Sequence, residues 1–211
     1  MVFYLSYISS FFVVVPLLIG SFFKTFQKKE VLFIFFLSLF SFLIEILNLT
    51  FSFTGTNNLF LQDIYTPMEF ILFALFYKTF FDSVYKSVIH YFVIGAFLCL
   101  AIFDSFFVND FFTINNFSDS LESIIFILYS LTAFFFIMKR LMFENLLNTP
   151  FFWINIAILI YFAGNLFLFM FSNYLQNNDR DQYLAVYNIH SVTNIIYYVL
   201  ISIGFWKSAR K

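Results

Sequence analysis

The segment Tyr183–Trp206 reads YLAVYNIHSVTNIIYYVLISIGFW, and its 24 residues are enough to cross a lipid bilayer as a helix. It contains no Lys, Arg, Asp or Glu. Five side chains with polar groups recur along it at steps of 4, 3, 4 and 3, which places them on one face of a helix. Because such a face would leave hydrogen-bonding groups unpaired in hydrocarbon, we expect it to face other helices or a hydrated cavity. The five residues are Tyr183, Tyr187, His190, Asn194 and Tyr197.

The composition of the whole chain is that of a protein embedded in a membrane. Of its 211 residues, 62% are hydrophobic and 11% are charged, whereas a soluble domain carries about a quarter charged residues. The mean hydropathy is +0.90, and the scarcity of charge leaves no room for a soluble catalytic domain. The net charge of −1 gives no indication of nucleic-acid binding. Cys99 is the one cysteine, which excludes an internal disulfide and a cysteine-based metal site.

Seven apolar segments separated by short loops follow one another along the chain. We therefore expect an all-α fold in which residues 1–211 form a single transmembrane domain, a bundle of seven helices. The first segment is kept as a span because no basic region precedes its long apolar run, unlike a signal peptide. The fourth is the poorest in polar residues, and we expect it to be the most exposed to lipid. The expected spans are approximately residues 2–23, 31–53, 63–81, 88–107, 119–138, 150–171 and 183–206.

Basic residues indicate how these spans are oriented. Ten of the eleven Lys and Arg residues fall on one side of the membrane, and only Arg180 falls on the other. Because cytoplasmic loops carry the excess of Lys and Arg, we expect the N-terminus outside and the C-terminus inside, in the inner (cytoplasmic) membrane of a cell. This pattern requires an odd number of spans. The ten residues are Lys24, Lys28, Lys29, Lys78, Lys86, Lys139, Arg140, Lys207, Arg210 and Lys211.

Polar residues of four different spans share one depth in the membrane. At 1.5 Å per residue, Glu45, Glu69, Asn165 and His190 fall roughly 9–12 Å below the outer surface. Separate helices have no reason to place polar groups at one depth unless these groups meet. The sequence therefore predicts a polar pocket in the outer half of the bundle, open away from the cytoplasm. Its candidate ligand-binding residues are Glu45, Glu69, Asn165, Tyr187, His190 and Asn194.

These polar residues also have a purely structural interpretation. A carboxylate near the middle of a membrane costs about 2.5–3.5 kcal/mol on insertion scales, yet Glu45 and Glu69 are tolerated if they are protonated or hydrogen-bonded. An interhelical hydrogen bond explains His190 as well as ligand binding does, and Asn194 suits helix packing better than ligand contact. Glu122 lies near the end of its span and is expected at the water interface.

No cofactor or metal ion is expected. His190, Glu45 and Glu69 are residue types that bind zinc or iron, but the chain has no HxxxH, HExxH or ExxH spacing. A retinal protein needs a lysine inside its last span, and the last span here has none before Lys207. No residue is assigned a catalytic role.

Three segments carry a resemblance to known proteins. YTPMEFILFALFYKTFF (Tyr65–Phe81), PFFWINIAILIYFAGNLFLF (Pro150–Phe169) and IHSVTNIIYYVLISIGFW (Ile189–Trp206) resemble segments of small, uncharacterised seven-helix membrane proteins of bacteria. These proteins are similar in turn to the seven-helix sensory module of some histidine kinases. The kinase's dimerisation helix and ATP-binding domain do not follow Lys211, so the resemblance implies a separate cytoplasmic signalling partner. Pro67-Met68-Glu69 is similar to the PxE element of membrane lycopene cyclases, without their further acidic motifs.

Three functions remain open on these grounds. The first is a receptor-like or sensory module that binds a small molecule from the outer side and signals through a cytoplasmic partner. The second is an intramembrane enzyme acting on a lipid or isoprenoid, with Glu45 or Glu69 as general acid or base. The third is a small transporter or a purely structural membrane subunit. Transport predicts discontinuous helices, for which Pro16 and Pro67 are the candidate breaks, and access to the cavity from both faces.

Overall fold

The computed structural model describes residues 2–29, 31–82, 88–104, 116–140, 145–178 and 180–210. Within these ranges the chain forms helices and no strand, so the all-α prediction is confirmed. Lys86 and Lys211 lie outside the described residues, as do the side chains of Arg140, Arg180 and Tyr183. The α-helices are α1 (Val2–Phe11), α2 (Val14–Phe22), α3 (Leu32–Thr54), α4 (Phe60–Phe81), α5 (Val88–Phe103), α6 (Asn116–Arg140), α7 (Pro150–Asn178) and α8 (Arg180–Ala209), with short 3-10 turns η1 (Thr25–Gln27) and η3 (Leu146–Asn148).

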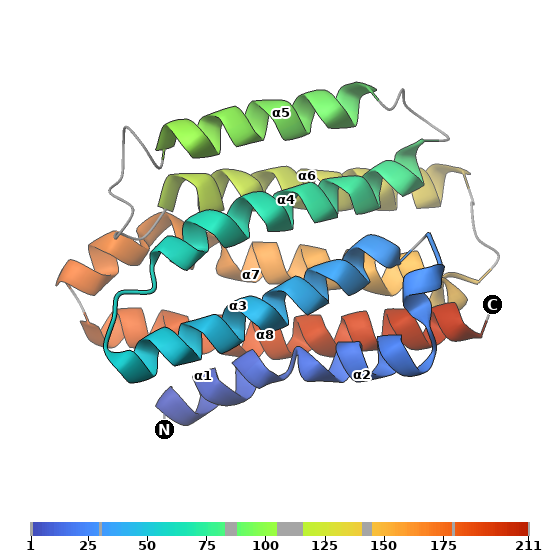
Figure 1. Ribbon diagram of the computed structural model, residues 1–211. Helices are drawn as coiled ribbons and strands as arrows, with labels where there is room; N and C mark the ends of the chain where they lie inside the picture. Colours follow the sequence, from blue (N-terminus) through green and yellow to red (C-terminus); the bar gives the residue numbers. More distant parts are fainter. Residues whose placement is uncertain are drawn as a thin grey trace.

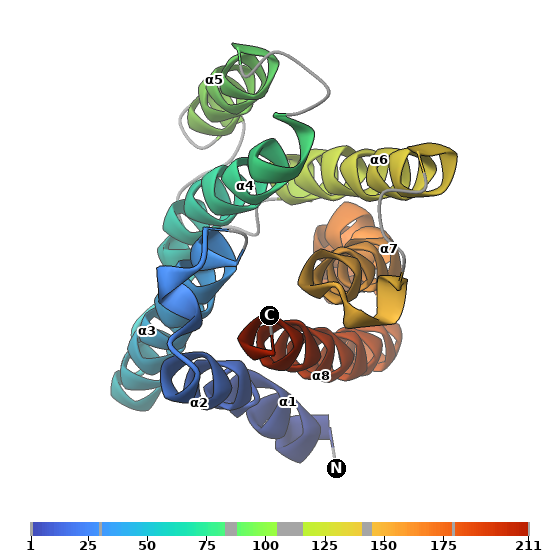
Figure 2. The ribbon, with the colours of Figure 1, turned by 90° about the vertical axis from the view of Figure 1, so that its right-hand side faces the viewer.

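The helices lie side by side along one long axis (Figure 1). Seen along that axis, α3, α4, α6, α7, α8 and the α1–α2 pair surround a common centre, and α5 lies outside α4 (Figure 2). Most residues of α5 are at least partly exposed, with His90, Phe97 and Ala101 as its buried positions. This agrees with the expectation that the fourth span packs least. An apolar groove of about 480 Å³ remains between α5 and α6.

Among the described residues, five stretches are long and apolar enough to cross a membrane, by length and composition. They are Leu5–Phe22, Leu32–Thr54, Phe117–Lys139, Pro150–Phe171 and Leu184–Ala209. The helix α5 is apolar but has only 16 residues. The helix α4 has 22 residues but carries Asp63, Glu69 and Lys78 along its length, and it is not among the five. A multi-pass membrane protein therefore fits the structure, while the count of seven spans and their orientation remain predictions.

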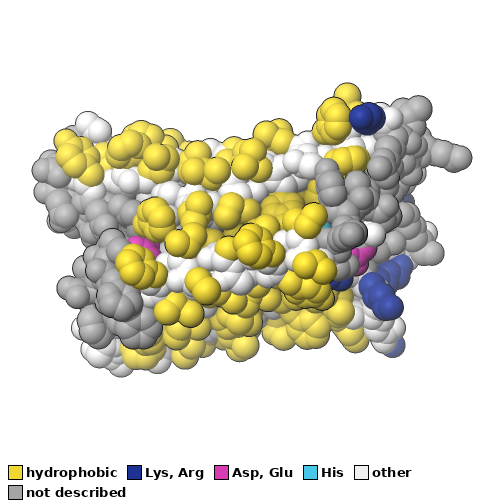
Figure 3. All heavy atoms as spheres, turned by 90° about the horizontal axis from the view of Figure 1, so that it is seen from above, with side chains coloured by type: hydrophobic (Ala, Val, Ile, Leu, Met, Phe, Trp, Pro, Cys, Tyr) yellow, Lys and Arg dark blue, Asp and Glu magenta, His cyan; other side chains and the backbone are white. Residues whose placement is uncertain are grey.

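Apolar side chains cover the outside of the bundle. Phe22, Phe53, Phe92 and Met138 are all more than 70% exposed, and Figure 3 shows one such face, with Lys and Arg side chains gathered at one end. That end holds the last turns of α4, α6 and α8, where Lys78, Lys139 and Lys207 lie. An apolar surface of this extent suits contact with hydrocarbon.

The two prolines that a transporter could use to interrupt helices behave differently. The first span is split into α1 and α2 just before the buried Pro16, which has no N–H to continue the helix. In contrast, α4 continues through Pro67. The discontinuity that transport would use is therefore present in the first span and not in α4.

Aromatic side chains fill the half of the bundle that ends at the basic residues. Phe70, Phe73 and Tyr77 of α4 are fully buried, and Tyr77 also forms hydrogen bonds to two other helices. Its hydroxyl donates to Asn155 Oδ1 of α7 at 2.8 Å and lies 2.6 Å from Ser130 Oγ of α6. These bonds fix α4 against α6 and α7.

The close packing of α7 against α8 leads to a prediction on two glycines. A Cβ atom at Gly204 would lie 2.7 Å from Ile154 Cγ1 of α7, whereas a Cβ at Gly95 would meet nothing within 4 Å. We predict that Gly204→Ala lowers the free energy of unfolding by about 1–3 kcal/mol through overpacking. Gly95→Ala, the same change in a helix interior, is predicted to leave it unchanged or to raise it by up to about 1 kcal/mol. SDS titration of each purified variant measures its free energy of unfolding. Equal changes for Gly204→Ala and Gly95→Ala would contradict the close packing of Gly204 against Ile154.

Candidate functional site

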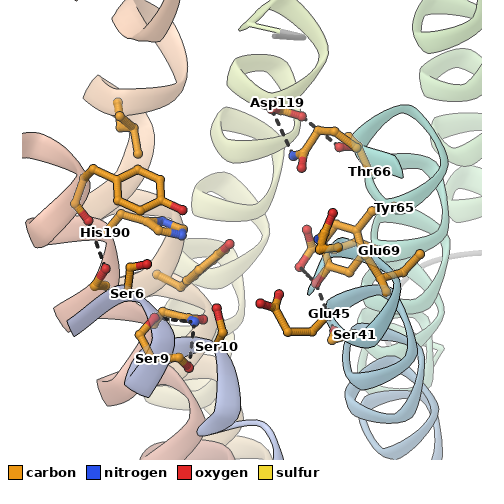
Figure 4. A pocket seen from close by; sticks show the side chains of 18 of the residues that line it. Ser6, Ser9, Ser10, Ser41, Glu45, Tyr65, Thr66, Glu69, Asp119 and His190 are labelled. Carbon is orange, nitrogen blue, oxygen red and sulfur yellow. Dashed lines mark hydrogen bonds between the residues drawn. The ribbon is translucent and has the colours of Figure 1, made fainter. Parts of the chain in front are cut away.

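A cavity of about 490 Å³ opens inside the half of the bundle opposite the basic end. Residues of α1, α3, α4, α6, α7 and α8 line it, together with Asn58 and Leu59 of the connection between α3 and α4. Figure 4 shows Glu45 and Glu69 on one wall and His190 on the opposite wall. Five of the six residues predicted from the sequence line this one cavity, namely Glu45, Glu69, Tyr187, His190 and Asn194.

The wall made by α3 and α4 is joined by hydrogen bonds. Glu69 is 5% exposed, and its Oε1 accepts a bond of 3.1 Å from the Tyr65 hydroxyl one turn earlier in α4. The same hydroxyl lies 3.0 Å from Ser41 Oγ of α3. Glu45 projects from α3 one turn beyond Ser41 and is half-buried. One carboxyl of this wall is therefore fixed by a tyrosine, and the other is more exposed.

The α6 wall adds two carboxyl groups that were not predicted as site residues. Asp119 accepts hydrogen bonds from Thr66 Oγ1 at 2.8 Å and from Gln62 Nε2 at 3.3 Å, both from α4. Glu122 is only 2% exposed, so the expectation that it lies at the water interface is wrong. Its Oε1 has no hydrogen-bond partner among the described residues, and it lines the same cavity as Glu69 and Asp119. The spacing of three residues between Asp119 and Glu122 was the sequence signal that both face one side.

The α8 wall carries His190 between Tyr187 and Asn194. The His190 ring lies 5.5 Å from the Tyr187 ring and 6.1 Å from the Tyr161 ring of α7, centroid to centroid. Its Nδ1 is buried and unpartnered within the described part of the chain. Asn194 Nδ2 donates to Ser9 Oγ at 3.1 Å and to the Ser9 carbonyl oxygen at 3.3 Å, which ties α8 to α1. Asn194 thus joins two helices, which is the role that the sequence analysis favoured for it over ligand contact.

Asn165 lies apart from the cavity lining, although its depth matches that of the other candidates. It is 1% exposed, and its Oδ1 accepts a hydrogen bond of 3.0 Å from Thr193 Oγ1 of α8. The neighbouring Gly164 explains this, because a Cβ there would lie 2.7 Å from Thr193 Cγ2. The backbones of α7 and α8 approach so closely at this level that Asn165 bonds to the next helix.

An aromatic layer closes the cavity toward the basic end. The Phe73 ring of α4 lies 5.6 Å from the Phe162 ring of α7 and 6.5 Å from the Tyr197 ring of α8. Phe126 of α6 lies 5.3 Å from Phe162 and completes the layer. All four residues are at most 6% exposed. The polar cavity therefore ends where these four helices meet.

The arrangement suits binding of a small molecule by carboxyl, hydroxyl and aromatic groups. Across the described residues, no three His, Cys, Asp or Glu side chains are grouped as metal ligands would be. Comparison with protein-family models, curated proteins and solved structures finds no significant match for the chain. The resemblance to seven-helix sensory modules therefore stays a hypothesis, and the site is interpreted from its own geometry.

The hydrogen bonds to Asp119 lead to a stability prediction. Thr66→Val keeps the shape of the side chain but removes the donor at 2.8 Å from a buried carboxyl oxygen. We predict a loss of about 1–3 kcal/mol in the free energy of unfolding, because an acceptor is left unpaired inside the bundle. Thr50→Val is the control, since the hydroxyl of the exposed Thr50 donates to the Ile46 carbonyl oxygen of its own helix. Thermal unfolding in mild detergent measures both, and equal midpoints for the two variants would contradict the prediction.

Proposed function

We propose that this protein is a receptor-like or sensory membrane module that binds a small molecule from the outer side of the inner membrane. The observation that carries the proposal is the one-ended cavity: polar groups line it at one half of the bundle, and Phe73, Phe126, Phe162 and Tyr197 close it at the other. A site of this form retains a ligand and offers no passage through the membrane. A transporter would need access from both faces.

The basic end is the proposed signalling surface, facing the cytoplasm in a seven-span topology. There, Lys28 Nζ donates to the Ser208 carbonyl oxygen, which ties the connection between η1 and α3 to the end of α8. Lys207 Nζ donates to Asn148 Oδ1 at 2.9 Å, which ties the end of α8 to η3, just before α7. Helices that line the cavity therefore share contacts at this end. A ligand that favours one packing of α3, α7 and α8 would alter the surface offered to anionic lipids or a cytoplasmic partner.

One observation favours a second candidate function. Glu122 has an unpartnered buried oxygen and lines the same cavity as Glu69, and two carboxyl groups in one cavity are the kind of pair that performs general acid–base catalysis. An enzyme acting on a lipid or isoprenoid would use this pair. Deletion of its gene would then change the lipid or pigment profile of the cell, whereas a sensory module would leave that profile unchanged.

Cysteine labelling tests the one-ended cavity and its orientation. In a Cys99→Ser background, which removes the exposed native thiol, single cysteines replace Ser10 and Ser52 of the cavity lining or the fully buried Ser130 beyond the aromatic layer. We predict that a membrane-impermeant maleimide reacts with the first two from the outer side and with Ser130→Cys from neither side. Cell suspensions and inside-out vesicles provide the two sides.

The control for sidedness is Asp82→Cys at the basic end, which should react only from the cytoplasmic side. Asp82 is exposed there and paired with Lys78 at 3.0 Å. Labelling of Ser130→Cys from the cytoplasm would indicate a path through the protein and favour transport. Labelling of Ser10→Cys from the cytoplasm would reverse the proposed orientation.

A further inference from the structure

We propose that the ligand of the cavity is an organic cation, a molecule with one or more protonated amino groups on an apolar chain or ring. This inference rests on the proposed function, since it names the chemical class that the receptor-like cavity would accept. Three features of the lining lead to it: an excess of carboxyl groups, a buried carboxyl oxygen without a partner, and walls of aromatic rings.

The charge of the lining is one-sided. Glu45, Glu69, Asp119 and Glu122 all line the cavity, and its described lining contains no Lys or Arg. Ionised carboxylates in a low-dielectric interior are costly unless an opposite charge is near them. Nothing in the described lining other than His190 can supply that charge. A bound cation would supply it and would relieve the repulsion among the carboxylates.

Glu122 is the residue most in need of such a partner. Asp119 has hydrogen-bond donors in Thr66 and Gln62, and Glu69 has a donor in Tyr65. Glu122 is 2% exposed, yet its Oε1 has no donor within the described chain. A buried acceptor usually has a hydrogen-bond partner in native proteins, so its absence here points to a donor that comes from a ligand. An ammonium group donates up to three hydrogen bonds and carries the required charge.

The remaining walls suit the apolar part of such a ligand. Tyr161, Phe162 and Phe169 of α7 and Tyr187 and Tyr197 of α8 line the cavity opposite the carboxyl groups of α3 and α4. The Tyr161 and Tyr197 rings lie 5.1 Å apart and form a continuous aromatic surface. The faces of such rings attract ammonium groups and pack against methylene chains. A volume of about 490 Å³ is in the range of pockets that enclose small organic molecules.

The test compares two probes of equal length that differ in charge. The purified full-length protein in mild detergent at neutral pH is titrated with 1,8-diaminooctane and with 1,8-octanediol, and binding is followed by calorimetry and by the thermal unfolding midpoint. We expect the diamine to bind and to raise the midpoint, and the diol to do neither. We expect Glu122→Gln, which keeps the shape of the side chain and removes its charge, to weaken diamine binding about tenfold or more.

Two further variants keep the result interpretable. Glu45→Gln changes a half-buried carboxyl of the cavity lining, is expected to fold, and should also weaken diamine binding. Asp82→Asn removes an exposed carboxyl at the opposite end of the bundle and should leave binding unchanged. Equal weakening by Asp82→Asn would show general electrostatic attraction and overturn the assignment to this cavity. Loss of the diamine effect in the presence of magnesium chloride at matched ionic strength would overturn the organic class in favour of an inorganic cation.

The failures of this inference and of the proposed function are distinguishable. Equal binding of the diol and the diamine would overturn the cationic class and leave a ligand-binding cavity in place. Absence of binding by either probe, with Ser10→Cys and Ser52→Cys still labelled from outside, would overturn the cationic class while the one-ended cavity stands. Labelling of Ser130→Cys from the cytoplasm would overturn the receptor-like function whatever the probes do.

Discussion

The structure depends on how carboxyl groups are accommodated inside an apolar bundle. Water is absent from the hydrocarbon of a bilayer, so each polar group within a span needs a partner inside the protein or a hydrated cavity. Asp119 and Glu69 find partners in Thr66, Gln62 and Tyr65, all of which lie on the first part of α4. The donors that satisfy these acidic groups are thus gathered on one helix, and their hydrogen bonds fix the first part of α4 against α6.

One half of the bundle holds the polar cavity, and the other half is close-packed. The cavity lies in the half opposite the basic residues, where short Ser side chains of α1 and α3 line it. In the other half, Phe73 and Tyr77 of α4 are fully buried and in ring contact with Phe126 of α6. Because a close-packed interior has low compressibility and transmits strain, we expect a shift of a helix at the cavity to be felt at the basic end. This division is the basis for proposing a sensory role over a route for solutes.

The polar groups of the bundle are satisfied to different degrees. Beyond the aromatic layer, Tyr77, Ser130 and Asn155 form hydrogen bonds with one another across three helices. Such a satisfied network fixes helix positions. Glu122 Oε1 and His190 Nδ1 have no described partner, and the same holds for His90 Nε2 and Ser208 Oγ at the basic end. Glu122 and His190 differ from these two in that they line the polar cavity.

The sequence alone determined the all-helical fold, the apolar stretches, the collection of basic residues at one end and the shared depth of Glu45, Glu69 and His190. These follow from hydropathy and from the fixed rise of a helix, which are properties of each segment by itself. Only the tertiary structure decided which groups meet. It placed Asp119, Glu122 and the serines of α1 in the cavity and turned Asn165 toward Thr193. The reason is that depth can be counted along one helix, whereas the rotation of each helix and its neighbours depend on how all of them pack.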